Sequence, residues 1–271
     1  MSYRHLRNQI EKLEAEMTSV EPHRIEVCRA KDKSLIYAVG DGLPHQILAA
    51  ESQVDYLRWL SSRLHLTTPR MDLLIGDRKS GTSWAGLVAA VSLAVANARN
   101  VGIFCDYCDG RGFDDVHDLL RAILPTHWST KDSEETGRYR LPRHTDLRVV
   151  AFSRPQSWPD HRSIIMVDDY SPTSERQLEA ILRQGMVQLV TGNPPIDDEP
   201  RTDWILRERD LARAAGTLHR FRSRQNQFLL RDAAGIEEMF EDITPEAESF
   251  WDDTGLEDSL RRARRTGRSS K

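Results

Sequence analysis

The chain has 271 residues, and its 39% hydrophobic content is that of a globular protein with a sizeable core in one large or two modest domains. It carries 38 Lys and Arg against 42 Asp and Glu, a net charge of -4, which does not favour binding to nucleic acid or membrane through overall charge. Three cysteines exclude a disulfide-rich scaffold, and no apolar run reaches the ~18 residues of a membrane span. The first residues lack the apolar stretch of a secretion signal, so we expect a cytoplasmic protein with no membrane partner.

The N-terminal part is expected to be helical. Apolar residues at helical spacing predict an amphipathic helix over 4–18 and a second helix over 43–64. Pro69 ends the helical pattern, and the apolar run that follows it at 71–75 predicts the first strand of the core.

Beyond this strand, short apolar runs alternate with helical stretches. We expect further strands at 101–105, 147–152, 164–167 and 186–190, and helices at 83–97, 116–124 and 173–184. The polar stretch 125–145 is expected to be an exposed connection. Strands that alternate with helices in this way predict an α/β fold with a mostly parallel central sheet flanked by helices on both faces.

A glycine-bounded turn follows the first strand. The segment Gly76-Asp-Arg-Lys-Ser-Gly-Thr-Ser83 resembles the phosphate loop G-x-x-x-x-G-K-[ST], in which N–H groups and a lysine hold phosphates and the final hydroxyl binds Mg²⁺. Gly81 fits the second glycine, but Thr82 stands in the place of the lysine, and Lys79 lies three residues earlier. The alternative is an ordinary tight connection between a strand and a helix.

Two more polar segments directly follow apolar strands. They are Asp168-Asp169 and Thr191-Gly192-Asn193. Carboxyl ends of parallel strands meet at the edge of the sheet where ligands bind, so we expect a site there. In a P-loop enzyme the first carboxylate holds the Mg²⁺ shell and the second orients the attacking water, which assigns these roles to Asp168 and Asp169. Ordinary turns are the alternative for both segments.

The order and spacing of these motifs, over about residues 45–255, resemble the ATPase domain of the large terminase subunit, the viral motor that packages DNA into procapsids. The resemblance implies a P-loop NTPase fold that uses ATP and Mg²⁺ and acts on double-stranded DNA. It also implies a homo-oligomeric ring that works with the portal, the small terminase subunit or a separate nuclease subunit. In such motors the segment Thr191-Gly192-Asn193 senses the outer phosphate and couples it to movement of the DNA-gripping part.

The resemblance also implies roles for single residues. Gln53, with Gln46 as a second candidate, would read the adenine edge. Lys79 would contact phosphate, and Arg78 would act as a catalytic arginine in cis. The remaining nucleotide-binding positions would be Gly76, Ser80, Gly81, Thr82 and Ser83. Ser83 and Asp168 would bind the Mg²⁺ ion.

These assignments divide the chain into four parts. They are an N-terminal helix and connection (1–42), a P-loop ATPase core (43–196), a small helical coupling segment (197–255) and a basic mobile tail (256–271). The tail could bind DNA phosphates or an acidic partner, or could simply be solvated. Because the chain stops where terminases continue into a nuclease domain, we expect no DNA cleavage.

Other interpretations remain open. The absent lysine favours a non-catalytic assembly module that docks a nuclease or portal partner, whereas the retained Ser83 and both carboxylates favour an enzyme. A small-molecule kinase is disfavoured, because no arginine-rich lid follows the second strand. Cys105 and Cys108 have the spacing of half a zinc site, but no second cysteine pair completes it.

Overall fold

The structure is a computed structural model, and the residues described are 28–29, 35–38, 44–47, 51–77, 80–105, 111–124, 128, 137–142, 145–151, 163–170, 175–194, 202–222 and 251. Three short strands, β1 (Cys28–Arg29), β2 (Leu35–Ala38) and β3 (Pro44–Ile47), form a small antiparallel sheet. The main body then runs in the order α2 (Glu51–Ser61), β4 (Arg70–Gly76), α3 (Thr82–Asn97), β5 (Val101–Cys105), α4 (Arg111–Ile123), β6 (Arg138–Leu141), β7 (Thr145–Ala151), β8 (Ser163–Val167), α6 (Glu175–Leu182), β9 (Gly185–Gly192), α7 (Thr202–Ala215) and β10 (Leu218–Phe221).

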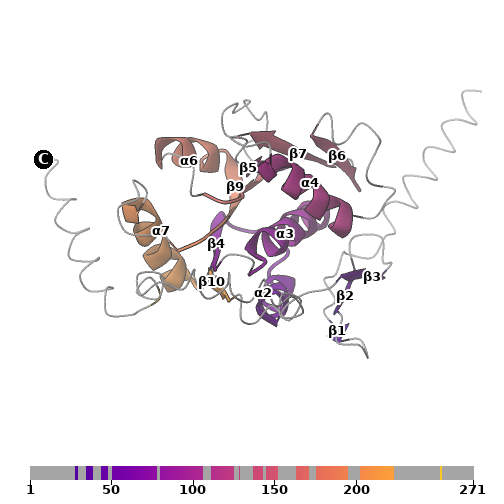
Figure 1. The fold of residues 1–271 in the computed structure, drawn as a ribbon, viewed down its shortest axis with the longest axis horizontal. Coiled ribbons are helices and arrows are strands. Elements are labelled where there is room, and N and C mark those ends of the chain that lie inside the picture. Colours follow the sequence, from indigo (N-terminus) through magenta and orange to yellow (C-terminus); the bar gives the residue numbers. More distant parts are fainter. Residues whose placement is uncertain are drawn as a thin grey trace, which may run out of the picture.

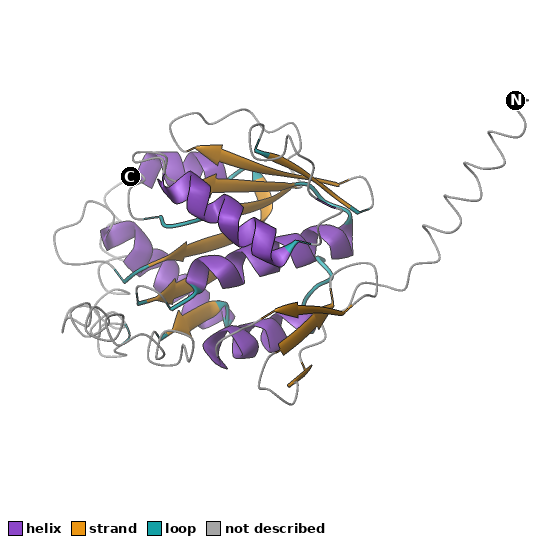
Figure 2. Ribbon diagram, turned by 45° about the vertical axis from the view of Figure 1, so that its right-hand side comes forward, coloured by secondary structure: helices purple, strands orange, loops and turns teal. Residues whose placement is uncertain are grey.

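The main body is a seven-stranded sheet with helices on both faces. Its strand order is β10-β4-β9-β8-β5-β7-β6, and every neighbouring pair is parallel except β6 with β7. Helices α2, α3 and α4 pack on one face, and α6 and α7 pack on the other (Figure 1). Figure 2 shows the strands of this sheet lying between the helices. The alternation of strands and helices in the sequence thus predicted the layer arrangement.

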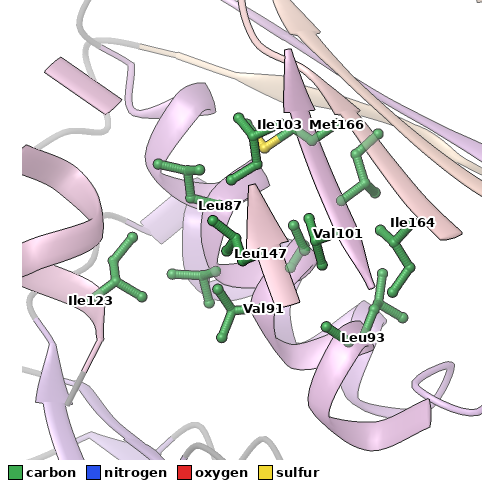
Figure 3. Packing of buried hydrophobic residues seen from close by; sticks show 14 of the residues in the cluster. Leu87, Val91, Leu93, Val101, Ile103, Ile123, Leu147, Ile164 and Met166 are labelled. Atoms are coloured by element: carbon green, nitrogen blue, oxygen red, sulfur yellow. The ribbon is translucent and has the colours of Figure 1, made fainter. Parts of the chain in front are cut away.

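Helix α3 forms the centre of the larger hydrophobic core. All its residues from Ala85 to Ala96 are buried, because α2, α4 and the sheet surround it. In Figure 3, Leu87 and Val91 of α3 lie among apolar side chains of the strands, and Ile123 of α4 lies on the other side. The sheet and the neighbouring helices therefore hold α3 in a fixed position, and with it the N-terminus of the helix.

Glycine lets α3 approach the sheet closely at one position. A Cβ atom on Gly86 would lie 2.7 Å from Met166 Cε in β8 and 2.7 Å from Thr191 Cγ2 in β9. The helix therefore contacts the ends of two neighbouring strands one turn after it begins.

Two segments between residues 43 and 196 differ from the sequence expectation. The helix expected over 43–64 is shorter, because β3 occupies 44–47 and α2 begins only at Glu51. The exposed connection expected over 125–145 contains β6, in which Tyr139 and Leu141 are buried and alternate with exposed arginines. Both errors concern strands of four residues, which are too short to show a clear period. The helix expected over 4–18 lies outside the described residues.

A further difference lies beyond residue 196, where the segment 197–255, expected to be helical, contributes a strand to the main sheet. Strand β10 lies in the 197–255 segment and pairs with β4, from Leu218 opposite Leu73 to Phe221 opposite Gly76. Within the same segment, Trp251 stacks beneath the Arg220 guanidinium, whose Cζ lies 4.6 Å from the ring centroid. The basic tail lies outside the described residues. In the part of the chain that the structure covers, no helix is both long and apolar enough to cross a membrane.

A matched pair of leucine substitutions tests the burial of α3. Leu87 is 0% exposed in α3, whereas Leu211 is 59% exposed in α7. We expect Leu87→Ala to lower the free energy of unfolding by about 2–5 kcal/mol, because it leaves a cavity in the core. Leu211→Ala is expected to change it by less than about 0.5 kcal/mol. Urea denaturation measures both, and equal effects would contradict this packing.

Candidate functional site

The polar segments singled out in the sequence meet at one edge of the main sheet. Strands β4, β9 and β8 are neighbours in that order, and all three are parallel. Ile75 of β4 lies opposite Gly192 of β9, and Val190 of β9 lies opposite Val167 of β8. The glycine turn, Thr191 and Asp168 therefore share the carboxyl edge, where ligands of open α/β sheets bind.

The glycine turn after β4 is held against β10. The Asp77 N–H donates to the Phe221 carbonyl oxygen (3.3 Å), and the Ser80 N–H donates to the Asp77 carbonyl oxygen (3.1 Å). A Cβ atom on Gly76 would lie 2.5 Å from both the Phe221 carbonyl oxygen and Ser80 Oγ, so only glycine fits there. Arg78 and Lys79 lie outside the described residues, and their roles stay predictions.

The turn ends at the start of α3. The Ala85 N–H donates to the Gly81 carbonyl oxygen (3.0 Å), which is the first turn of this helix. The first N–H groups of a helix have no partner within it, and they lie at the positive end of the helix dipole. In α3 these groups belong to Thr82 and Ser83, so the turn presents donors suited to phosphate oxygens.

Gln53 of α2 contacts the turn directly. It is 5% exposed, and its Nε2 donates a hydrogen bond to the Gly81 carbonyl oxygen (3.1 Å). Gly81 has a left-handed backbone with φ 86, and a Cβ atom there would lie 2.0 Å from Gln53 Nε2. The side chain expected to read adenine thus holds the glycine turn in place. Gln46, the second candidate, lies in β3.

A pocket of about 310 Å³ adjoins the turn. It is lined by Ser52, Asp55 and Tyr56 of α2 and by Leu218, His219, Arg220 and Arg222 on the side of β10. Two lining residues of this pocket are sequence neighbours of residues that hydrogen-bond the glycine turn. Ser52 precedes Gln53, and Arg222 follows Phe221. The hydroxyls of Ser52 and Tyr56 are buried without a hydrogen-bond partner among the described residues. The polar groups that this pocket offers to a ligand are therefore the charged side chains of its lining, Asp55, Arg220 and Arg222.

Asp168 receives hydrogen bonds from both neighbouring elements. Its carboxylate is buried, and it accepts from Thr191 Oγ1 (2.7 Å) and from the Ser83 hydroxyl at the start of α3. Burial raises the pKa of Asp168, the two hydrogen bonds oppose that shift, and the charges of Asp169 and Asp115 add to it. A buried carboxylate beside two other acids favours a bound cation.

The donor set fits Mg²⁺. This ion prefers oxygen ligands and is commonly held by one or two carboxylates together with phosphate oxygens and water. Ser83 and Asp168 supply one hydroxyl and one carboxylate in mutual contact. Among the described residues no group of three or more His, Cys, Asp or Glu side chains could hold a metal, and Cys105 is a buried free cysteine. Cys108 lies outside those residues.

Asp169 lies on the exposed side of the same turn. Its backbone has φ 51, in the left-handed region, and its N–H donates to Thr191 Oγ1 (3.1 Å). Aspartate enters this region more readily than most side chains do, because its short polar group can hydrogen-bond locally. The conformation thus gives a physical reason for Asp at this position. The Thr191 hydroxyl, between the two acids, fixes this turn.

Sequence reasoning missed Tyr170, the next residue. It is 1% exposed, and its hydroxyl donates to the Asn193 carbonyl oxygen (2.7 Å). A Cβ atom on Gly192 would lie 2.3 Å from Tyr170 Cδ1, so the ring packs directly on the end of β9. An aromatic residue after two acids, together with a glycine at the end of another strand, was the signal available in the sequence.

Comparison with protein-family models and with curated proteins finds no match for this chain. Among solved structures, it is similar to the large terminase of a thermophilic bacteriophage, with a TM-score of 0.50 and 11% sequence identity. The likeness covers 71% of this chain and 49% of the terminase chain, so this chain spans about half the length of that protein. The predicted fold class, an α/β fold with a mostly parallel central sheet flanked by helices, is confirmed, and the fold is terminase-like.

Two glycine substitutions test the contact between Gln53 and the turn. Gly81 and Gly216 both have positive φ, but a Cβ atom on Gly216 would have no neighbour within 4 Å. The left-handed backbone costs alanine about 1–2 kcal/mol at either position. We expect Gly81→Ala to cost about 1–3 kcal/mol more than Gly216→Ala, because its methyl group overlaps Gln53. Urea denaturation measures both costs. The difference should shrink when Gln53→Ala is added, and a difference that persists would contradict the contact.

Proposed function

We propose that this chain is the ATP-hydrolysing motor domain of a terminase-type DNA translocation machine. The contact between the Ser83 hydroxyl and the Asp168 carboxylate, at the end of the glycine turn, carries the proposal. In P-loop NTPases a hydroxyl and a carboxylate from these two elements hold the Mg²⁺ of the bound nucleotide. The terminase-like fold favours a DNA motor over other P-loop enzymes, and we expect it to act in the cytoplasm.

In this proposal ATP lies along the carboxyl edge of β4. The N–H groups of Gly81, Thr82 and Ser83 would hold the phosphates, whereas the Ser80 N–H is already bonded to the Asp77 carbonyl oxygen within the turn. Gln53 supports the turn through the Gly81 carbonyl, and the adjoining pocket is where the nucleoside would bind. Lys79 would supply a cation to the outer phosphates in place of the lysine that Thr82 replaces.

The hydrolysis step would use the two acids differently. Ser83 and Asp168 would hold Mg²⁺, which when bound neutralises charge on the β- and γ-phosphates. Asp169 would orient a water molecule, whose oxygen forms the new bond to the γ-phosphorus as the bond to the bridging oxygen breaks, leaving ADP and phosphate. Arg78 would stabilise the negative charge of the transition state.

Coupling to DNA would involve the end of β9. Thr191, Gly192 and Asn193 would report loss of the outer phosphate to the parts that grip double-stranded DNA. A ring of copies, working with a portal, a small terminase subunit or a separate nuclease subunit, would enclose the DNA.

Thr82 favours a second candidate function. Without a lysine at this position a P-loop loses a cation that stabilises charge during phosphoryl transfer. The chain would then be a catalytically weakened assembly module that docks a nuclease or portal partner. Such a module could still bind nucleotide, because Ser83 and the turn remain.

The deciding experiment is Mg²⁺-dependent ATP turnover, with and without double-stranded DNA, at several protein concentrations. We expect Lys79→Ala and Asp168→Ala each to lower turnover by about 100-fold or more, since each removes a charge at the reacting phosphates. Asp118→Ala is the matched control, because Asp118 is exposed on α4 and pairs with Arg121. Turnover that survives both substitutions would reject this site. Nucleotide binding without turnover would favour the assembly module.

The pH dependence of nucleotide binding tests the role of Thr191. Its hydroxyl donates to Asp168 and so opposes the rise in the pKa of that carboxyl group. Thr191→Val removes the donor, so the pKa of Asp168 rises further and a higher pH is needed to ionise it. Because Mg²⁺ binds the ionised form, the acid limb of Mg²⁺-dependent ATP binding should move up by about one pH unit.

The measurement is a titration with a fluorescent ATP analogue between about pH 5 and 8. Thr145→Val is the control, because Thr145 is also buried but donates to the Pro142 carbonyl oxygen at the far side of the sheet. An acid limb that does not move in Thr191→Val, with binding otherwise intact, would show that this hydrogen bond does not tune Asp168.

A further inference from the structure

Tyr170 connects the carboxylate turn to the end of β9 by three contacts. Its N–H donates to the Thr191 carbonyl oxygen (3.1 Å), and its hydroxyl donates to the Asn193 carbonyl oxygen (2.7 Å). Between these two bonds the ring packs on Gly192, where any side chain would overlap it. Tyr170 thus bonds both ends of the Thr191–Asn193 segment, which comprises residues 191 to 193. Its backbone N–H bonds the first residue and its hydroxyl bonds the last.

The hydroxyl contact lies beyond the strand ladder. Gly192 is the last residue of β9, and its partner in β4 is Ile75. Asn193 follows the ladder, where strand pairing no longer fixes the backbone. The hydrogen bond from Tyr170 therefore determines where the chain goes as it leaves the site.

The same ring also contacts helix α7. The ring centroids of Tyr170 and Trp204 lie 6.2 Å apart, and both residues are at least 98% buried. Helix α7 packs on β4 and β10, the two strands that hold the glycine turn. Close-packed side chains transmit displacements, since the interior leaves little free volume to absorb them.

We propose that Tyr170 is a positioning residue that holds the Thr191–Asn193 segment to the carboxylate turn and transmits displacement of that segment to α7. The transmission rests on the proposed function, because bound nucleotide would produce the displacement. The holding role does not depend on it. Tyr170 touches none of the atoms expected to react, so it acts through Thr191, Asn193 and Trp204.

The first test uses the full-length protein without nucleotide. Hydrogen exchange measured by mass spectrometry compares wild type, Tyr170→Phe and the control Tyr139→Phe. Tyr139 is a buried tyrosine whose hydroxyl bonds His117, and it lies in β6 at the opposite edge of the sheet. We expect Tyr170→Phe to speed exchange at residues 189–194 by about 5- to 10-fold, and Tyr139→Phe to leave it unchanged. Unchanged exchange in Tyr170→Phe overturns the holding role.

The second test adds Mg²⁺ and a non-hydrolysable ATP analogue. In wild type we expect exchange to change both at 189–194 and in α7, at residues 202–215. In Tyr170→Phe the change in α7 should fall by about 3-fold or more, whereas the affinity for the analogue stays within about 2-fold. Correspondingly, kcat for ATP should fall by about 3- to 10-fold without a rise in KM. A merely structural role would not separate these quantities.

The outcomes distinguish this inference from the proposed function. An α7 response in Tyr170→Phe equal to that of wild type overturns the transmission role. Absence of nucleotide binding by wild type rejects the proposed function and the transmission together, while the comparison without nucleotide still decides the holding role.

Discussion

The hydrogen bond between Thr191 and Asp168 unites the three elements that build the candidate site. The Thr191 hydroxyl donates to the carboxylate at the end of β8 and accepts from the N–H of Asp169. Its methyl group lies against Gly86 of α3, the helix that delivers the Ser83 hydroxyl to the same carboxylate. A side chain without the hydroxyl would leave a buried acid with one donor fewer, and a larger one would move α3 away from the sheet. The site geometry therefore depends on this one residue.

Long apolar runs and glycine positions made most of the sheet predictable. Strands β4, β5, β8 and β9 are mostly buried, and each contains an apolar run, as expected for central parallel strands. The edge strand β6 was missed because Arg138 and Arg140 stand at alternate positions and make its four residues look like a polar connection. Strand β3 was missed because its four residues lie within a longer stretch whose apolar residues have helical spacing, and so short a strand shows no period of its own.

The candidate site was predictable to the level of motifs but not of side-chain contacts. The sequence places polar residues directly after several apolar strands. Because these strands are parallel, one edge of the sheet is shared by Ser83, Asp168 and Thr191. The pairing of hydroxyls with carboxylates depends on the position of β9 between β4 and β8. The order of strands in a sheet cannot be predicted from the spacing of residues within single segments. The contact of Gln53 with the turn and the packing of Tyr170 on Gly192 depend on the same order.

The position of β4 also bears on how a newly made chain folds. Both strands that flank it come late, because β9 begins at residue 185 and β10 at residue 218, whereas β4 ends at residue 76. Pairing between segments so far apart in the chain is slow, since a long loop must close before either contact forms. During synthesis, β4 and the apolar helix α3 must wait until β9, at residues 185–192, has emerged. That interval exposes them to aggregation, and the side of the sheet formed by β4 and β10 is the last to be completed.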